Sequence, residues 1–170
     1  MKLTSKAMNI LSKYGVSIDE AKTAGIAAFN KRIGLVQELN RISAEIRELE
    51  ERAETLRKYR EVKPIHQEYI SLSGRKKEKY KKEHGGSLQE FHTLNQKLHE
   101  WYPDGRTPTV EKMEKMIDDL TARRIQKNAE YKAADQRSRE LSEAAREIEN
   151  YLCQEQSQEQ QKRKKRNYLE

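Results

Sequence analysis

The sequence predicts an all-α protein, organised as a long antiparallel coiled-coil hairpin with a small helical cap at its distal end. Its composition is 34% hydrophobic and 37% charged, which is less apolar and more charged than an average globular domain. Seven glycines and three prolines are too few for the turns of a β-sandwich or barrel. Two long stretches repeat apolar residues at three- and four-residue steps, a spacing typical of helices that pack in pairs.

Five segments are expected: a short N-terminal helix, a first coiled-coil arm, a helical cap, a second arm and a polar, basic tail, at residues 1–16, 17–63, 64–106, 107–153 and 154–170. The N-terminal helix, Leu3–Tyr14, should end at Gly15, since glycine favours the left-handed conformation that follows a helix. The first-arm helix should run from Ile18 to Val62.

Local signals set the expected ends of the two arms. Ser17 and Glu20 have the spacing of a capping box at the start of the first arm. Pro64 should end that arm near Lys63, because proline disfavours helical geometry in the residue before it. Thr107-Pro108 matches an N-cap followed by a first-turn proline, and predicts the start of the second arm.

Each arm carries an apolar seam that needs a partner helix. In the first arm the seam follows alternating steps of four and three, at Leu35, Leu39, Ile42, Ile46, Leu49, Ala53 and Leu56. The second seam keeps one heptad frame from Val110 to Leu152, with Arg124 and Lys127 as polar members near its middle. An intramolecular antiparallel pair buries both seams, and a parallel dimer of each helix is the competing arrangement.

The cap is expected to hold two helices, with a break near Ser73-Gly74 or a continuation into the basic run, and a turn at His84-Gly85-Gly86-Ser87. Apolar residues recur at helical spacing after that turn, at Leu88, Phe91, Leu94, Leu98 and Trp101. This spacing favours a packed core anchored by Trp101 over a surface for base stacking. Beyond Leu152 the apolar pattern stops, and the tail either extends the helix into solvent or frays.

The net charge of +7 is concentrated in two basic clusters. The candidate nucleic-acid-binding residues are Arg75, Lys76, Lys77, Lys79, Lys81 and Lys82 at the distal cap, and Lys162, Arg163, Lys164, Lys165 and Arg166 at the opposite end. Such clusters favour weak electrostatic contact with the DNA backbone, although RNA, a protein or a membrane surface offers similar anionic groups. The alternative is that these charged residues are simply exposed to solvent and bind no partner.

No pattern of catalytic or metal-binding residues stands out. The four histidines lack the spacing of a zinc helix, and Gly85-Gly86 lacks the strand and Lys-Ser/Thr of a phosphate loop. Cys153 has no activating base nearby, and a lone cysteine suits a reducing compartment. We therefore expect no enzyme activity, no metal and no cofactor. Without a spanning segment or an export signal, a cytoplasmic protein with no membrane partner is expected.

The order of features resembles the C-terminal helical region of relaxases, the mobilisation nucleases of Gram-positive conjugative and mobilisable elements such as plasmids. The resemblance spans Ala7–Leu152 and includes the stretches YGVS, LRKYREVKPIHQEYI, RTPTVEKMEKMIDDL, EYKAA and REIENYL, at residues 14–17, 56–70, 106–120, 130–134 and 146–152. The spacing of Tyr59, Pro64 and Tyr69 and the Thr-Pro entry to the last helix are its most specific parts.

The resemblance implies a role in conjugation without the chemistry of the family. Relaxases nick DNA with a tyrosine nucleophile and a histidine-bound metal in an N-terminal domain, and this sequence lacks that domain and its histidine motif. No catalytic residue is therefore carried over. The implied function is an accessory module that contacts DNA or relaxosome proteins. The alternative is a structural coiled-coil adaptor for protein–protein interaction, and a homodimer is possible in either case.

Overall fold

The computed structural model describes residues 5–167, and their side chains through Lys164. Over that range it contains four helices and no strand: α1 (Ser5–Tyr14), α2 (Ala21–Ser71), α3 (Gly74–Trp101) and α4 (Val110–Asn167). The all-α class is confirmed. The helices form two compact units. We name them the terminal unit, from residues up to Asn40 and from Ile125 onward, and the central unit, Arg41–Arg124.

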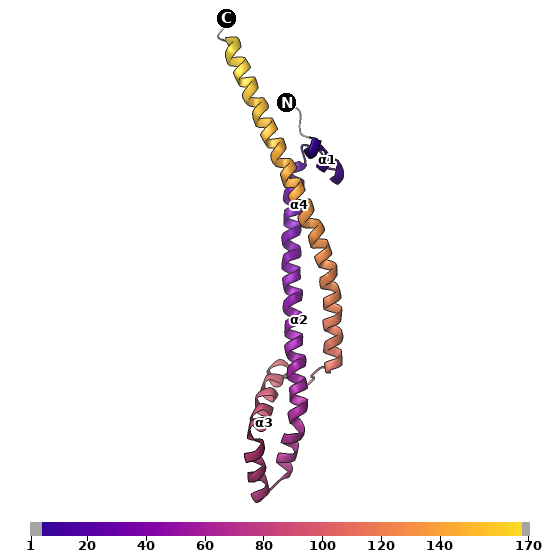
Figure 1. Cartoon of the computed structure of the whole chain (residues 1–170), viewed down its shortest axis with the longest axis vertical. Helices are drawn as coiled ribbons and strands as arrows, with labels where there is room; N and C mark the ends of the chain where they lie inside the picture. The colour runs from indigo at the N-terminus through magenta and orange to yellow at the C-terminus, as the bar shows by residue number, and fades with distance from the viewer. Residues whose placement is uncertain (1–4, 168–170) are drawn as a thin grey trace. The chain divides into compact units, whose positions relative to one another are not determined.

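In the terminal unit, α2 and α4 pack antiparallel and α1 covers one side of the pair (Figure 1). Cross-helix ion pairs show the direction, because partner numbers on α4 fall as those on α2 rise: Lys22 to Glu149 (3.4 Å), Arg32 to Asp135 (2.8 Å) and Glu38 to Lys127 (3.4 Å). The core beneath α1 consists of Ala7, Ile10, Leu11, Ala21, Ala28, Leu141, Ala144 and Ile148. Four of these eight are alanines, so the helices approach closely.

In the central unit, α3 folds back against the C-terminal half of α2, and the start of α4 packs on the same helix (Figure 1). Two neighbouring clusters form its core, and their buried members are Ala53, Leu56, Leu98, Val110 and Met113 in one and Val62, Phe91 and Leu94 in the other. Trp101 is half-buried against the first cluster. The predicted apolar face of residues 88–101 is therefore core, as expected.

The predicted α2 seam is largely buried, and the predicted α4 seam is buried in part, with Arg124 and Leu152 exposed. Leu35, Ile42, Ile46, Ala53 and Leu56 are buried, and the remaining two seam residues are half-buried. On α4 the two polar seam residues differ. Arg124 is exposed, whereas the Lys127 ammonium lies 3.4 Å from Glu38 and 3.1 Å from Glu130. These carboxylates raise the pKa of Lys127, Glu130 first and Glu38 second.

The expected start of the first arm is displaced by three residues. Gly15 has the predicted left-handed conformation, with φ +61°. However, α2 begins at Ala21 rather than Ile18, and Glu20 precedes it. The Glu20 carboxylate accepts hydrogen bonds from the Ser17 N–H (3.1 Å) and the Ser17 hydroxyl (2.7 Å). These two bonds lower the pKa of Glu20, the hydroxyl contributing more, and they close the turn before the helix.

The prediction that Pro64 ends the first arm is wrong, because α2 continues through it to Ser71. Proline removes one helical hydrogen bond, but Pro64 is exposed, so water can satisfy the carbonyl that loses its donor. Tertiary packing holds the helix on both sides of it. Tyr59 precedes Pro64 and His66 follows it, and both rings stack on Phe91, with centroids 5.3 and 3.9 Å away.

Two further boundary predictions are wrong. The turn expected at residues 84–87 is a kink inside α3, where His84 alone leaves helical geometry (φ −118°, ψ 19°). The second arm begins at Val110 rather than after Thr107. Its cap is Thr109, whose hydroxyl accepts a hydrogen bond from the Lys112 N–H at 3.2 Å. The break at Ser73-Gly74 is confirmed, with Gly74 at φ +57°.

The tail takes the extended-helix alternative. α4 continues to Asn167, and every residue from Leu152 through Lys164 is exposed.

Candidate polyanion-binding site

The first three turns of α3 carry most of the predicted cations. We call residues 75–82 the basic segment. Arg75, Lys76, Lys79, Lys81 and Lys82 are exposed there, and Lys77 is half-buried. The segment lies in the central unit, on the part of α3 that precedes the kink at His84. All six predicted residues of this cluster thus lie on the first turns of one helix, α3.

Helical spacing arranges three of these cations in a row. Arg75, Lys79 and Lys82 lie at positions i, i+4 and i+7 and so share one face. The row spans about 10 Å along the axis at 1.5 Å per residue. Phosphates repeat along a DNA strand over comparable distances, so one row can meet two or more phosphates.

Contacts with α2 hold the opposite face of the segment. The Tyr80 hydroxyl donates a hydrogen bond to the Glu68 carboxylate at 2.9 Å, and the Lys77 ammonium lies 4.7 Å from the centre of the Tyr69 ring. Burial and the Glu68 carboxylate raise the pKa of Tyr80, in that order. The tyrosine therefore stays a neutral donor at physiological pH. These contacts fix the rotation of the helix, so that its other face points to solvent.

Most cations of the segment have no acidic partner. Lys79 lies 3.8 Å from Glu83 in an exposed pair, which contributes little energy. Within the described residues, no carboxylate lies at ion-pair distance from Arg75, Lys76, Lys81 or Lys82. Elsewhere in the same unit, Arg57 and Arg60 pair with Glu114 and Glu111 across the helices. The basic segment is thus a local excess of uncompensated charge.

The second predicted cluster lies at the end of α4. Lys162, Arg163 and Lys164 are exposed on this unpacked helix. Lys165 and Arg166 belong to the same predicted cluster, but their side chains lie outside the described residues. Because no packing orients the helix here, this cluster supplies positive charge without a defined binding face.

A ring cluster beside the basic segment was missed by sequence reasoning. His66 stacks face to face on Phe91, with an interplanar angle of 10°, and His92 meets His66 edge-on at 5.5 Å. Burial lowers the pKa of His66, and the charge of His92 lowers it further. We expected the first-arm helix to end before Pro64 and a separate cap helix to follow it, so the place of His66 opposite Phe91 could not be derived.

Other kinds of site find little support. In the part of the chain that the structure describes, no group of three or more His, Cys, Asp or Glu side chains is placed to hold a metal ion. Cys153 is exposed. Among residues 5–167 no helix has both the length and the apolar character needed to cross a membrane.

Comparison with known proteins adds no relative. No family model, no curated protein and no solved structure matches this chain. The class that the structure itself defines is a helical protein of two units, with a cationic helix on the central one.

Proposed function

We propose that this chain is a non-catalytic helical module that binds the phosphate backbone of DNA, as an accessory of conjugative DNA mobilisation. The observation that carries the binding proposal is the solvent-facing row of Arg75, Lys79 and Lys82. Their charge is largely uncompensated, and Tyr80 and Lys77 fix the orientation of the helix. Contacts of this kind give affinity without sequence choice.

The proposed role in mobilisation rests on the resemblance to the C-terminal region of relaxases. It also rests on DNA being the ligand proposed for this chain and the molecule on which relaxases act. DNA, rather than RNA or an acidic protein, is the ligand that this role requires. In cells that carry the conjugative element, deletion of this chain should lower the transfer frequency, and expression in trans should restore it. Unchanged transfer would contradict the mobilisation role but leave the binding proposal standing.

A matched pair of triple variants tests the binding site. Arg75→Gln, Lys79→Gln and Lys82→Gln together remove the row. Lys58→Gln, Lys112→Gln and Lys115→Gln remove the same charge from exposed positions of the same unit. If three phosphate contacts are lost, the slope of log affinity against log salt should fall by about 2.7 for the row variant. The control variant should change the slope by less than about 1, since only its long-range field is altered.

The binding measurement uses fluorescence anisotropy with a labelled duplex at two salt concentrations. Circular dichroism checks that both variants keep their helix content. Failure of the wild-type protein to bind at low salt would overturn the proposal. Equal losses in the two triple variants would also overturn it, because they would show that net charge alone is responsible.

A structural adaptor that binds only proteins is the second candidate function. It is favoured by large apolar side chains that lie exposed on the terminal unit, among them Ile26 (55%), Phe29 (45%) and Ile33 (40%). DNA binding lost only in the row variant would decide against this candidate as the sole function.

A further inference from the structure

The first half of α2 has a second apolar face beside its buried seam. Ile26, Phe29, Ile33 and Val36 follow steps of three, four and three, and they are 55%, 45%, 40% and 37% exposed. Each of these residues directly follows one that faces α4, and those preceding residues are Gly25, Ala28, Arg32 and Leu35. The exposed face therefore borders the contact between α2 and α4. We call these four residues the α2 stripe. Its spacing is that of a coiled-coil seam without a partner.

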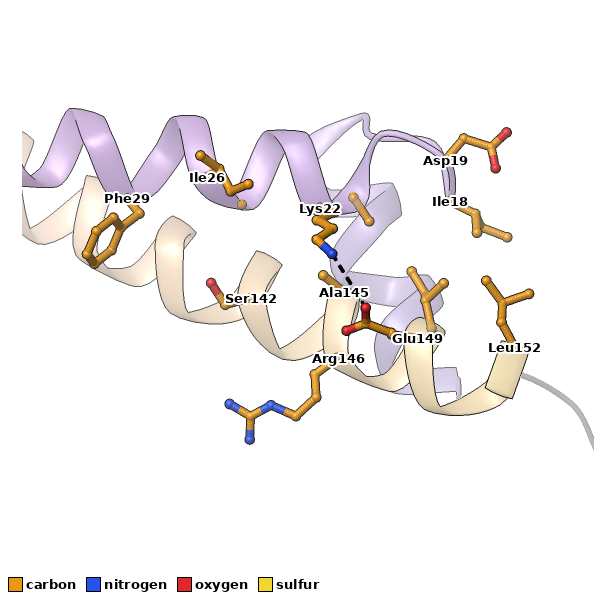
Figure 2. Close-up of a pocket in the computed structure, with 13 residues that line it drawn as sticks. Ile18, Asp19, Lys22, Ile26, Phe29, Ser142, Ala145, Arg146, Glu149 and Leu152 are labelled. Carbon is orange, nitrogen blue, oxygen red and sulfur yellow. Dashed lines mark hydrogen bonds and ion pairs between the residues drawn. The ribbon is translucent and has the colours of Figure 1, made fainter. Parts of the chain in front are cut away.

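Ile26 and Phe29, the first two residues of the stripe, lie in one wall of a groove in the terminal unit, and α4 forms the other wall (Figure 2). Ile33 and Val36 continue the same face of α2 beyond the groove. Ser142, Ala145, Glu149 and Leu152 recur on the α4 wall at steps of three and four, and the groove encloses about 560 Å³. Gly25 lies where α2 and α4 approach each other, since a Cβ added there would lie in ordinary contact, 3.7 Å from the Leu141 carbonyl carbon. The shape suits a helix lying along the groove.

α1 occupies the other side of the same helix pair. It pairs with α4 through Lys6 to Glu143 and Lys13 to Glu140. On a helix of 3.6 residues per turn, positions 140 and 143 lie on the side of α4 away from Ala145 and Glu149. One side of the α2–α4 pair is therefore covered by the chain itself, and the equivalent side is open. A helix in the open groove would complete a four-helix arrangement.

We propose that the occupant of this groove is a second copy of the chain, bound as a two-fold symmetric dimer in which the two α2 stripes pack antiparallel. The axis passes between Phe29 and Ile33. Phe29 of one copy then packs against Ile33 of the other, and Ile26 against Val36. This pairing satisfies the rule that a two-fold interface must be complementary to itself.

Charge on the groove favours a copy of the chain over an acidic or basic partner. The margin of the stripe away from α4 carries Thr23, Asn30 and Gln37, which are uncharged in a chain that is 37% charged. The groove lining carries two acids and two bases: Asp19 and Arg146, and the pair of Lys22 with Glu149 at 3.4 Å. The charges that line the groove therefore balance. The groove favours neither an acidic nor a basic ligand, and two copies of the chain can approach without repulsion.

The exposed area is also of the size that a dimer needs. The α2 stripe with Ile18 (43%) and Leu152 (48%) presents about 500 Å² of apolar surface, near the upper limit for patches on monomers. With its polar margins, the face approaches the roughly 800 Å² per partner of a standard interface.

Sedimentation velocity measures the association. The wild-type chain should dimerise, and Phe29→Lys with Ile33→Lys should raise the dissociation constant by about tenfold or more, because each copy would bury two charges. Ile125→Lys is the matched control, since Ile125 is 67% exposed on the same unit and outside the groove. A chain that stays monomeric at about 100 μM, a concentration well above that of typical specific dimers, would overturn the proposal. A double variant that dimerises like the wild type would also overturn it.

Cross-linking tests the direction of packing. In a Cys153→Ser background, a chain with Ile26→Cys mixed with a differently tagged chain with Val36→Cys should form a disulfide-linked heterodimer. Neither variant alone should link efficiently. Efficient linking of Ile26→Cys to itself would indicate a parallel pair and would overturn the antiparallel arrangement. Circular dichroism of each variant confirms the fold, and all substituted positions are exposed.

Discussion

The terminal and central units use the same α2–α4 pair in different ways. The terminal unit packs alanines such as Ala21, Ala28 and Ala144 between its helices. The central unit packs larger side chains, including Phe91, Leu98 and Met113. Alanine buries little area, but it lets helices approach closely. The comparison teaches that the unit with the thinner core also carries polar contacts at the edge of its helix pair, such as the ion pair of Arg32 with Asp135.

The two units also differ in the side chains that they expose to solvent. The central unit buries most of its large apolar side chains, although Ile70 and Met116 are exposed, and it exposes cations on α3. The terminal unit leaves Ile26 and Phe29 exposed and pairs many of its charges across helices. One unit therefore offers a surface for anions, and the other offers a surface for an apolar partner.

The largest expected effect comes from Phe91→Ala, which should destabilise the central unit by about 3–5 kcal/mol by leaving a cavity between α2 and α3. Phe91 is 7% exposed and stacks on His66 and Tyr59. Hydrogen exchange should show faster amides in residues 62–98 and unchanged amides in residues 24–39.

Leu141→Ala gives the converse experiment. Leu141 is fully buried in the terminal unit, and its truncation should cost about 2–5 kcal/mol. Here residues 24–39 should lose protection while residues 62–98 keep it. If either variant accelerates exchange equally in both ranges, the two units are a single cooperative structure and the contrast between them fails.

A smaller effect is expected at Glu140, which joins α4 to α1 in the terminal unit. Its carboxylate accepts hydrogen bonds from the Lys13 ammonium (2.7 Å), the Tyr14 hydroxyl (2.6 Å) and the Gln136 amide (3.0 Å). These donors lower its pKa from 4.5 to about 2, Lys13 first. Because the folded-state pKa is depressed, the stabilisation is complete above pH 4.5 and is lost as the pH falls towards 2.

Glu140→Gln should therefore lower the free energy of unfolding by about 1 kcal/mol at pH 7, and by progressively less below pH 4.5. Urea titrations at several pH values measure this. Glu143→Gln is the control, since its pair with Lys6 is exposed and should contribute less to stability than the Glu140 contacts. Equal effects of the two substitutions would mean that α1 docks without the Glu140 contacts.

The smallest effect is expected from Gly34→Ala in α2. A Cβ at Gly34 meets nothing within 4 Å, so alanine should stabilise the helix by about 0.5–1 kcal/mol by reducing the freedom of the unfolded chain. Gly15→Ala should have the opposite sign, because Gly15 has φ +61°. Thermal unfolding measures both. A destabilising Gly34→Ala would reveal a contact at that face, such as the proposed dimer.

Much of the architecture could be predicted from spacing alone. The seam from Leu35 to Leu56 and the face from Leu88 to Trp101 were predicted correctly, because a helical repeat survives without knowledge of tertiary partners. The cations of the basic segment were also located from sequence, and all six lie on α3. Their roles stay predictions, as does the resemblance to relaxases.

Element ends were predicted poorly, and for a common reason. Local rules placed a boundary at Pro64 and a turn at His84-Gly85-Gly86-Ser87. Tyr59 and His66 stack on Phe91 on either side of Pro64, where α2 stays continuous, and the second site is only a kink at His84. The α2 stripe at residues 26–36 was overlooked for a different reason. Its four-three spacing is visible in the sequence, but only the structure shows that α4 and α1 use the neighbouring faces and leave this one open.

Because the protein has a single tryptophan, its intrinsic tryptophan fluorescence reports on only one of the two units. Trp101 lies in the central unit, beneath the Arg52 guanidinium, whose carbon is 5.5 Å from the ring centroid. Its emission therefore follows the melting of that half of the protein, whereas far-ultraviolet dichroism averages over every helix. A denaturation curve recorded by fluorescence alone would say nothing of whether α1 is still docked.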